Sequence, residues 1–346
     1  MRSRTSSSMA ENPLPIAPSH SWLRRVAVVA ALLVLFLAVA GFLYENISEA
    51  RDRRFNPMPG HLIDVGSFKM HIYCTGEGSP AVILDAGLGD TYVSWRKVQP
   101  QISKFARVCS YDRAGLGYSD ASPHARTSKV IAEELHALLQ AAKVPPPYVL
   151  VGHSMAGYDV RLYASLYRSE VAGMVLVDAS HPEQENRLPP ELKNMEGSWQ
   201  REAEFLEYST PFGVPRLIGL CDEDVVARAA ECNWHTAQES AAELKAISQS
   251  AAEAGKTGSL GDLPLVVLSH DPEKPSAELP PDLAKSTNEA WEKMQEELGH
   301  LSTRGTQTIV KDSGHYIQLD EPEAVIAAIH SVVEQARAAG TTPPAK

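Results

Sequence analysis

Four short apolar segments, separated by stretches with helical spacing, restrict the fold of this chain most strongly. Each has the length of a strand and lacks the polar alternation of a half-exposed strand, as in strands buried on both faces: residues 80–87, 106–112, 148–153 and 173–179. Between two of them, Ile131, Leu135, Leu138 and Leu139 recur at the spacing of an amphipathic helix. Parallel strands need crossover connections, so this alternation predicts an α/β fold with a mostly parallel sheet and helices on both faces.

Further strands of the sheet are expected before and after these four segments in the sequence. Residues 62–76 are typical of two short strands joined by a Gly-Ser turn, which predicts an antiparallel hairpin. Residues 264–270 and 306–311 are two further strand candidates, and an amphipathic helix follows them. The core is therefore predicted in two parts, residues 55–181 and 263–338.

The two parts of the core are separated by residues 182–262, which are too many for an ordinary connection. Their apolar spacing indicates helices over residues 190–208 and 225–254, with prolines and a glycine between them. We interpret this region as an inserted helical lid. Beyond the core, residues 339–346 are expected to form a disordered tail.

The N-terminal region contains an uncharged apolar run, residues 26–43, that is long enough to cross a bilayer as a helix. We predict a transmembrane helix over residues 26–44, preceded by a cytoplasmic, disordered segment of residues 1–25. For the orientation of this helix in the membrane, Arg24 and Arg25 favour a cytoplasmic N-terminus. The alternative is a signal sequence cleaved after Ala40, which would release a secreted or periplasmic protein.

In either case the catalytic domain is expected outside the cytoplasm, where disulfides form. Cys221 and Cys232 are the expected pair, whereas Cys74 and Cys109 lie in apolar strand-like segments and are expected to be buried free thiols. The cysteines show no spacing typical of a metal site, so neither a metal nor another cofactor is predicted. The net charge of -11 argues against nucleic acid as a partner.

Ser154 lies between a strand candidate and a helical pattern, in the stretch "YVLVGHSMAGY". A chain that turns from strand to helix within two residues crowds its backbone, so small residues are needed nearby, here Gly152, Ala156 and Gly157. Such a turn would hold the hydroxyl at the carboxyl edge of the sheet, beside the N–H groups of a helix N-terminus. That is the geometry of an acyl-transfer nucleophile. The alternative is a serine that merely caps a helix.

A serine nucleophile needs a base and a third group that orients the base. His315 lies late in the chain in "SGHYIQLDEPEAV", between a strand candidate and the last helix. Together with "DAGLG", "YDRAGLGYSD" and "VGHSMAG", in this order along the chain, this segment resembles the α/β-hydrolase fold family, in its serine hydrolase branch with a helical lid. The resemblance covers roughly residues 60–338.

The resemblance implies that Ser154 is the nucleophile and that His315 acts as general base and then as general acid. It implies an oxyanion hole made by the backbone N–H groups of Leu88 and Met155. The family places the acid after one of the two strands that flank the lid, which leaves the choice open. Asp271 is expected and Asp178 is the alternative, and the remaining candidates are Glu273 and Glu183.

A serine at the corner, where epoxide- and halide-processing relatives carry aspartate, implies acyl transfer to water. We therefore expect a hydrolase that cleaves a carboxylic ester or a related acyl bond through an acyl-enzyme. Carbon–carbon bond hydrolysis or perhydrolysis at the same site are alternatives, as is a non-catalytic membrane-tethered binding protein. The apolar residues of the lid favour a small-molecule substrate with an apolar group, and "TPFGVPRLIGL" suggests a lid that docks on the membrane.

Overall fold

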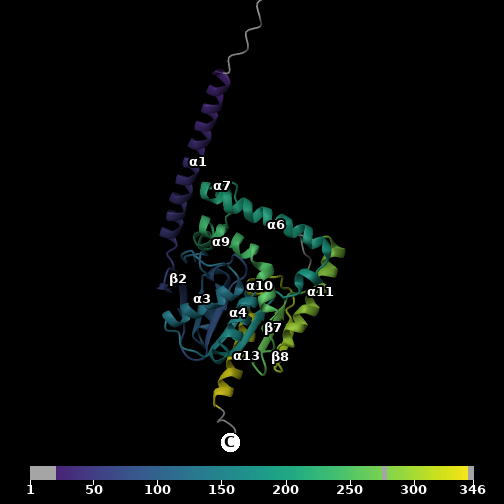
Figure 1. Ribbon diagram of the computed structural model, residues 1–346. Helices are drawn as coiled ribbons and strands as arrows, with labels where there is room; N and C mark the ends of the chain where they lie inside the picture. The colour runs from purple at the N-terminus through teal and green to yellow at the C-terminus, as the bar shows by residue number, and fades with distance from the viewer. Residues whose placement is uncertain (1–20, 275–278, 342–346) are drawn as a thin grey trace, which may run out of the picture.

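The computed structural model describes residues 21–274 and 279–341, which form an eight-stranded sheet in the order β1-β2-β4-β3-β5-β6-β7-β8 (Figure 1). β1 and β2 form the predicted antiparallel hairpin, β2 is antiparallel to β4, and the other pairs are parallel. The predicted fold class is confirmed. The strands are β1 His61–Asp64, β2 Lys69–Thr75, β3 Ala81–Asp85, β4 Val108–Tyr111, β5 Tyr148–His153, β6 Val171–Val177, β7 Leu265–Ser269 and β8 Gly305–Ile309.

Helices follow most of the strands, and six of them, α5 to α10, lie between β6 and β7. We refer to residues 182–262 as the lid segment. The helices are α1 Ser21–Phe55, η1 Tyr92–Trp95, α2 Gln99–Ile102, α3 Ser128–Ala141, α4 Ala156–Leu166, η2 Arg168–Glu170, α5 Gln184–Arg187, α6 Pro190–Ser209, η3 Thr210–Phe212, α7 Val214–Leu217, α8 Val225–Glu231, α9 Trp234–Lys245, α10 Ile247–Ala254, α11 Pro281–Gly299, α12 Ile317–Asp320 and α13 Pro322–Thr341.

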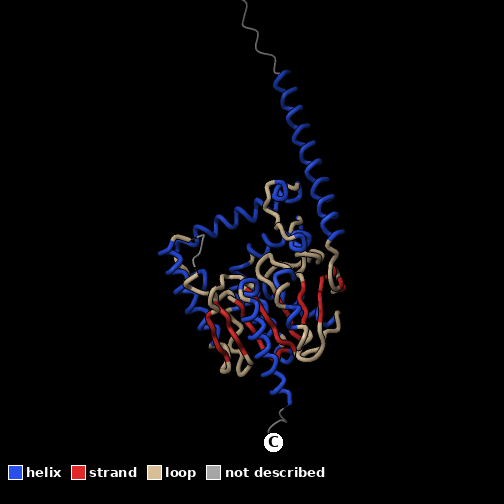
Figure 2. Tube along the Cα trace, turned by 180° about the vertical axis from the view of Figure 1, so that it is seen from behind, coloured by secondary structure: helices blue, strands red, loops and turns tan. Residues whose placement is uncertain are grey.

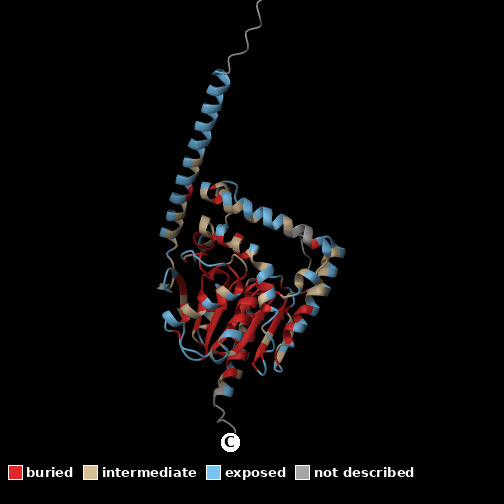
Figure 3. Cartoon of the chain, in the orientation of Figure 1, coloured by how far each residue is buried: buried red, intermediate tan, exposed pale blue. Residues whose placement is uncertain are grey.

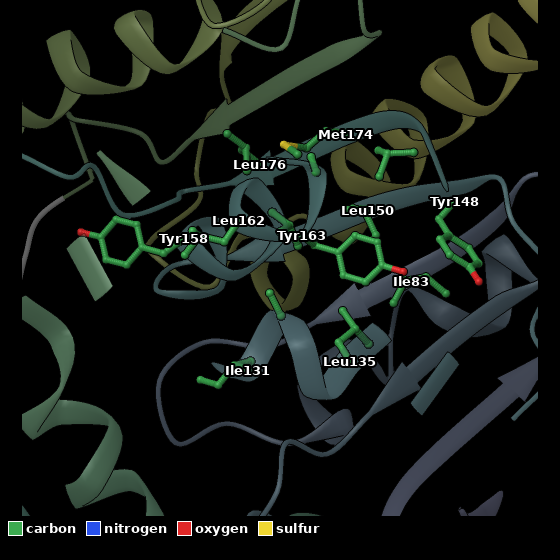
Figure 4. Close-up of a cluster of buried hydrophobic side chains, with 14 of the residues drawn as sticks. Ile83, Ile131, Leu135, Tyr148, Leu150, Tyr158, Leu162, Tyr163, Met174 and Leu176 are labelled. Atoms are coloured by element: carbon green, nitrogen blue, oxygen red, sulfur yellow. The ribbon is translucent and has the colours of Figure 1, made fainter. Parts of the chain in front are cut away.

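The sheet is covered on both faces, so its central strands are buried throughout (Figures 2 and 3). On one face Ile83, Leu150 and Leu176 pack against α3 and α4 (Figure 4). On the other face their chain neighbours, such as Val82 and Val151, pack against α13 and the region around α2. Adjacent strand residues point to opposite faces, which explains why these strands carry apolar residues without alternation.

The helical regions differ from the sequence prediction in two places. Residues 225–254 form three helices instead of one. Asn233 separates α8 from α9, because its side chain accepts a hydrogen bond from the N–H of Thr236 at 2.9 Å and caps α9; α9 and α10 are separated at Ala246. At the end of the chain α13 continues to Thr341, so residues 339–341 are helical and not disordered. Residues 342–346 of the predicted tail lie outside the described residues.

Helix α1 is longer than the predicted transmembrane segment. It begins at Ser21 and ends at Phe55, and its most apolar window has a mean hydropathy of 3.0 and is 0% buried (Figure 3). By length and composition α1 is able to cross a bilayer. Residues 1–20 of the predicted cytoplasmic segment lie outside the described residues.

The cysteines form two disulfides, Cys74–Cys109 and Cys221–Cys232. The second is the expected pair, but the prediction of free thiols at Cys74 and Cys109 was wrong. The sheet order explains the error, because β4 lies beside β2, and this register places Cys74 directly opposite Cys109. Strand neighbours are not visible in the spacing of the sequence.

Arg113 joins the sheet to the lid segment. Its buried guanidinium donates to both carboxylate oxygens of Glu243 on α9, at 2.6 and 2.8 Å. It also donates to Asp85 at the end of β3 and to the carbonyl oxygens of residues 86–87. Glu243 in turn accepts the N–H of Gly89 at 3.1 Å. The loop after β3 is therefore held between one arginine of the core and one glutamate of the lid segment.

Replacing Glu243 by alanine is expected to lower the free energy of unfolding by about 3–5 kcal/mol, because the buried guanidinium of Arg113 then loses a negatively charged partner. Lys245→Ala is the control on the same helix; Lys245 is 54% exposed and pairs with Glu207, so its loss should cost less than about 1 kcal/mol. Urea unfolding of the full chain in detergent, followed by circular dichroism, measures both. Equal losses would contradict the anchoring role of Glu243.

Candidate active site

Ser154 lies in the corner between β5 and α4. Its φ of 53° is in the left-handed region, and its N–H donates to the carbonyl oxygen of Val177 on β6 at 3.1 Å. A Cβ atom at Gly152 would lie 2.7 Å from the carbonyl oxygen of Ala156, and one at Gly157 would lie 2.6 Å from the Cβ of Ala179. Larger residues at these glycines would push strand and helix apart. The small residues around Ser154 thus permit the sharp turn.

His315 lies in the loop between β8 and α12, and its imidazole reaches Ser154. The Nε2 atom is 2.9 Å from the Ser154 Oγ. Two hydrogen bonds hold this loop, from the Ser313 hydroxyl to the carbonyl oxygen of Val310 at 2.7 Å and from the Gly314 N–H to Asp320 at 2.6 Å. The His315 side chain is 43% exposed, so the pair is open to a reactant.

Asp178 completes the chain of hydrogen bonds. It follows β6 directly, has a φ of 43°, and places its Oδ2 2.6 Å from the Nδ1 of His315. Because a carboxylate accepts, Nδ1 carries the proton and the Nε2 lone pair faces the Ser154 hydroxyl. Burial raises the pKa of Asp178, but hydrogen bonds from His270 and His315 outweigh it and hold that pKa well below its ordinary value. The carboxylate therefore stays charged beside the imidazole.

Asp271, the expected acid, does not contact His315. Its carboxylate accepts hydrogen bonds from the N–H groups of Asp312 and Glu273, at 3.0 and 3.1 Å, and from Lys311 at 3.3 Å. These contacts turn the side chain towards the loop after β8. The structure therefore corrects the expected geometry, because Asp178 and not Asp271 lies against the histidine. Glu273 likewise faces Lys311.

Two residues that the sequence analysis did not place in the site also bind Asp178. The Nδ1 of His270, after β7, is 2.9 Å from Oδ2, and Trp291 of α11 donates its indole N–H to Oδ1 at 2.8 Å. Burial lowers the pKa of His270, but the Asp178 carboxylate outweighs burial and raises that pKa above its ordinary value. His270 directly follows a predicted strand, and this position could have placed it at the site. Nothing in the sequence links Trp291 to this site.

The predicted oxyanion donors lie on either side of this corner. Met155 directly follows Ser154, and Leu88 is in the loop after β3; at Gly87 in that loop, a Cβ atom would lie 2.9 Å from the Nδ1 of His153. Among residues 21–274 and 279–341, neither the N–H of Leu88 nor that of Met155 has a hydrogen-bond partner. Unpaired N–H groups beside a helix N-terminus suit an anion.

Within the described part of the chain, no group of three or more His, Cys, Asp or Glu side chains is placed to hold a metal ion. The chemistry available here is that of a hydroxyl, an imidazole and a carboxylate in a line, with backbone donors nearby. This arrangement can activate the hydroxyl as a nucleophile and accept negative charge on a substrate oxygen.

Comparison with known proteins finds similar sequences and solved structures of similar fold. The uncharacterized protein YqjL of Bacillus subtilis (strain 168) is 27% identical over 268 residues, 74% of this chain and 85% of YqjL. The uncharacterized protein YbdG of the same strain is 28% identical over 164 residues, 47% of this chain, and the match spans 50% of YbdG. A thermophilic esterase from Thermogutta terrifontis, with malate bound, is 22% identical at a TM-score of 0.55, with 80% of this chain and 98% of that chain covered.

A family model described as the alpha/beta hydrolase fold matches residues 80–212, which include the loop after β3, the Arg113 turn and the Ser154 corner. The matched sequence, the sheet order and the similar solved structures agree with one another. The chain has the alpha/beta hydrolase fold, and its residues 80–212 match the model of that family.

Proposed function

We propose that this chain is a serine hydrolase that cleaves a carboxylic ester through an acyl-enzyme. The observation that carries the proposal is the continuous hydrogen-bonded line from Ser154 through His315 to Asp178, at 2.9 and 2.6 Å. A hydroxyl in such a line loses its proton to the imidazole as it attacks a carbonyl carbon.

In the first half of the reaction, Ser154 Oγ bonds to the carbonyl carbon while its proton moves to the Nε2 of His315. The carbonyl oxygen becomes an alkoxide that faces the N–H groups of Leu88 and Met155; such donors contribute roughly 3–4 kcal/mol each in other enzymes. Asp178 stabilises the imidazolium. The carbon–oxygen bond to the alcohol then breaks, and the alcohol leaves with the proton from His315.

In the second half, water replaces the alcohol. It gives a proton to His315 and attacks the acyl carbon, and a second alkoxide forms against the same donors. This intermediate expels Ser154, which recovers the proton from His315, and the carboxylic acid leaves. The steps need no metal, oxidant or reductant, so the chain's own residues account for the whole reaction.

We further propose that residues 182–262 act as the lid and that α1 anchors the enzyme as a single-pass membrane protein. Six helices between β6 and β7 support the lid, and the apolar, exposed part of α1 supports the anchor. Arg24 and Arg25 before the apolar run favour a cytoplasmic N-terminus, with the catalytic domain on the other side. The apolar residues of the lid segment favour a substrate with an apolar group.

Ser154→Ala is expected to abolish both labelling by a fluorophosphonate probe and hydrolysis of p-nitrophenyl esters, because no other group is activated at the corner. Ser103→Ala is the control, since this half-buried serine follows α2 and its hydroxyl donates to the carbonyl oxygen of Pro100. Gel fluorescence and release of p-nitrophenol measure the result. Labelling that persists in Ser154→Ala would reject the nucleophile, and an unlabelled wild type would favour a non-catalytic binding protein.

Asp178→Asn is expected to reduce kcat on the order of 10⁴-fold, because the amide favours the wrong imidazole tautomer. Asp271→Asn is the matched control on the other strand end, and its kcat should stay within a few-fold of the wild type. Ester turnover of both variants decides the choice. A large loss in Asp271→Asn with a normal Asp178→Asn enzyme would reverse the assignment.

His270 is expected to make stability depend on pH. Its pKa is raised in the folded chain, so the charged pair with Asp178 stabilises fully below the ordinary histidine pKa of about 6.5, and this contribution is lost as pH rises through the raised value. The difference in unfolding free energy between wild type and His270→Asn should therefore shrink from acid to alkaline pH. Denaturant titrations at several pH values test this, and a constant difference would contradict it.

A further inference from the structure

The lid segment exposes large apolar side chains over residues 205–220, at the end of α6 and through η3 and α7. Tyr208 is 69% exposed and Leu217 is 65% exposed. The others are also exposed: Phe205, Phe212, Ile218 and Leu220. Water-soluble surfaces rarely carry so many large apolar side chains in one continuous segment. We call residues 205–220 the apolar tip.

An arginine inside the apolar tip holds it to α1. Arg216 donates to Asp52 at 2.6 Å and to Glu45 at 3.2 and 3.3 Å, and it also donates to the carbonyl oxygen of Cys232 at 2.9 Å. Glu45 is only 1% exposed although it lies on a helix that is otherwise mostly exposed. The buried charges are paired with one another, which fixes the apolar tip against one side of α1.

Close backbone contacts determine where along α1 the apolar tip lies. A Cβ atom at Gly41 would collide with the carbonyl oxygen of Phe212, and one at Gly213 would lie 2.7 Å from the ring of Tyr44. The apolar run of residues 26–43 has 18 residues and spans ~27 Å as a helix, close to the roughly 30 Å of a bilayer core. The apolar tip therefore meets α1 where its apolar run ends (Figures 1 and 3). If this run fills a bilayer core, the tip lies at the level of one bilayer surface.

We propose that the apolar tip is a membrane-docking surface that inserts into the leaflet around α1, and that the enzyme takes lipid-soluble acyl substrates from this leaflet. The second part rests on the proposed ester hydrolysis. A bilayer is the occupant because any membrane that holds α1 must lie beside Phe212. The residues that follow the tip are acidic: Asp222, Glu223 and Asp224. Insertion is therefore driven by apolar burial and needs no anionic lipid.

A cavity of about 400 Å³ extends from the apolar tip to Gly89 in the loop after β3. Leu206, Pro215 and Leu220 line it at the tip, and Gly89 lines it at the loop that carries Leu88. The disulfide Cys221–Cys232 forms part of its wall. An acyl chain that leaves the bilayer beside Leu220 would follow this cavity as far as Gly89, the residue next to Leu88; polar side chains such as Glu231 and Ser240 also line it.

Docking is tested by fluorescence quenching on the full chain in phosphatidylcholine vesicles. No cysteine of the described residues is free, so Leu217→Cys provides a thiol for an environment-sensitive dye. Leu166→Cys is the control; Leu166 is 43% exposed at the end of α4, which runs from the carboxyl edge of the sheet to its opposite edge. We expect phosphatidylcholine with a spin label high in its acyl chain to quench the dye at position 217 several-fold more than at 166. Equal quenching would overturn the docking surface.

Substrate entry is tested with two esters, one long-chain ester dissolved in the vesicles and one short water-soluble p-nitrophenyl ester. For the double variant Leu217→Glu, Ile218→Glu, the ratio of the bilayer-ester rate to the soluble-ester rate should fall at least tenfold, whereas Leu166→Glu should leave the ratio unchanged. An unchanged ratio in the double variant would overturn entry from the leaflet. If the wild type cleaves neither ester, the proposed hydrolysis and the entry route both fail, whereas the quenching result still decides docking.

Discussion

A sheet whose central strands are buried on both faces leaves its carboxyl edge as the place where polar side chains can gather. Ser154 follows β5, Asp178 follows β6, His270 follows β7 and His315 follows β8, so four neighbouring strands each deliver a polar residue to this edge. The Asp178 carboxylate, after β6, accepts hydrogen bonds from His270 after β7 and from His315 after β8, and it also accepts one from Trp291. The charge that orients His315 is therefore also a structural link between β6, β7 and α11.

The parts of the site that the sequence predicted are those fixed by local geometry. Ser154 stands between a strand and a helix with small residues at set distances, and His315 stands in a loop before the last helix, so a short stretch identifies each. The acid differs, because Asp178 and Asp271 both follow buried strands and only their side-chain directions separate them. The Asp271 carboxylate accepts hydrogen bonds from an N–H group of its own loop and from one of the loop after β8. The preceding residue, His270, is the one that reaches the shared carboxylate.

The fold shows the same division between local and distant information. The strands and the hairpin follow from apolar patterns along the chain, and so does the number of residues between β6 and β7. The disulfide between Cys74 and Cys109 depends on which strand lies beside β2, and apolar patterns do not specify strand order. The interruption of the helix at residue 233 depends on a single asparagine cap, which a pattern of apolar residues passes over. The Cys74–Cys109 disulfide and the Asn233 cap were therefore found only in the structure.

The lid segment is held at two distant points, and this limits how the site can open. Glu243 fixes α9 to Arg113 and to the loop that carries Leu88, while Arg216 fixes the apolar tip to α1. Only residues 56–60 separate α1 from β1, so a short segment connects α1 to the sheet. A large swing of the whole lid would break buried charge pairs at one end or the other, which costs several kcal/mol. Smaller movements of α6, which precedes both points in the chain, avoid this cost. Because the lid segment is fixed to both α1 and the sheet, the proposed docking of the apolar tip on a membrane would also fix the position of the sheet relative to that membrane.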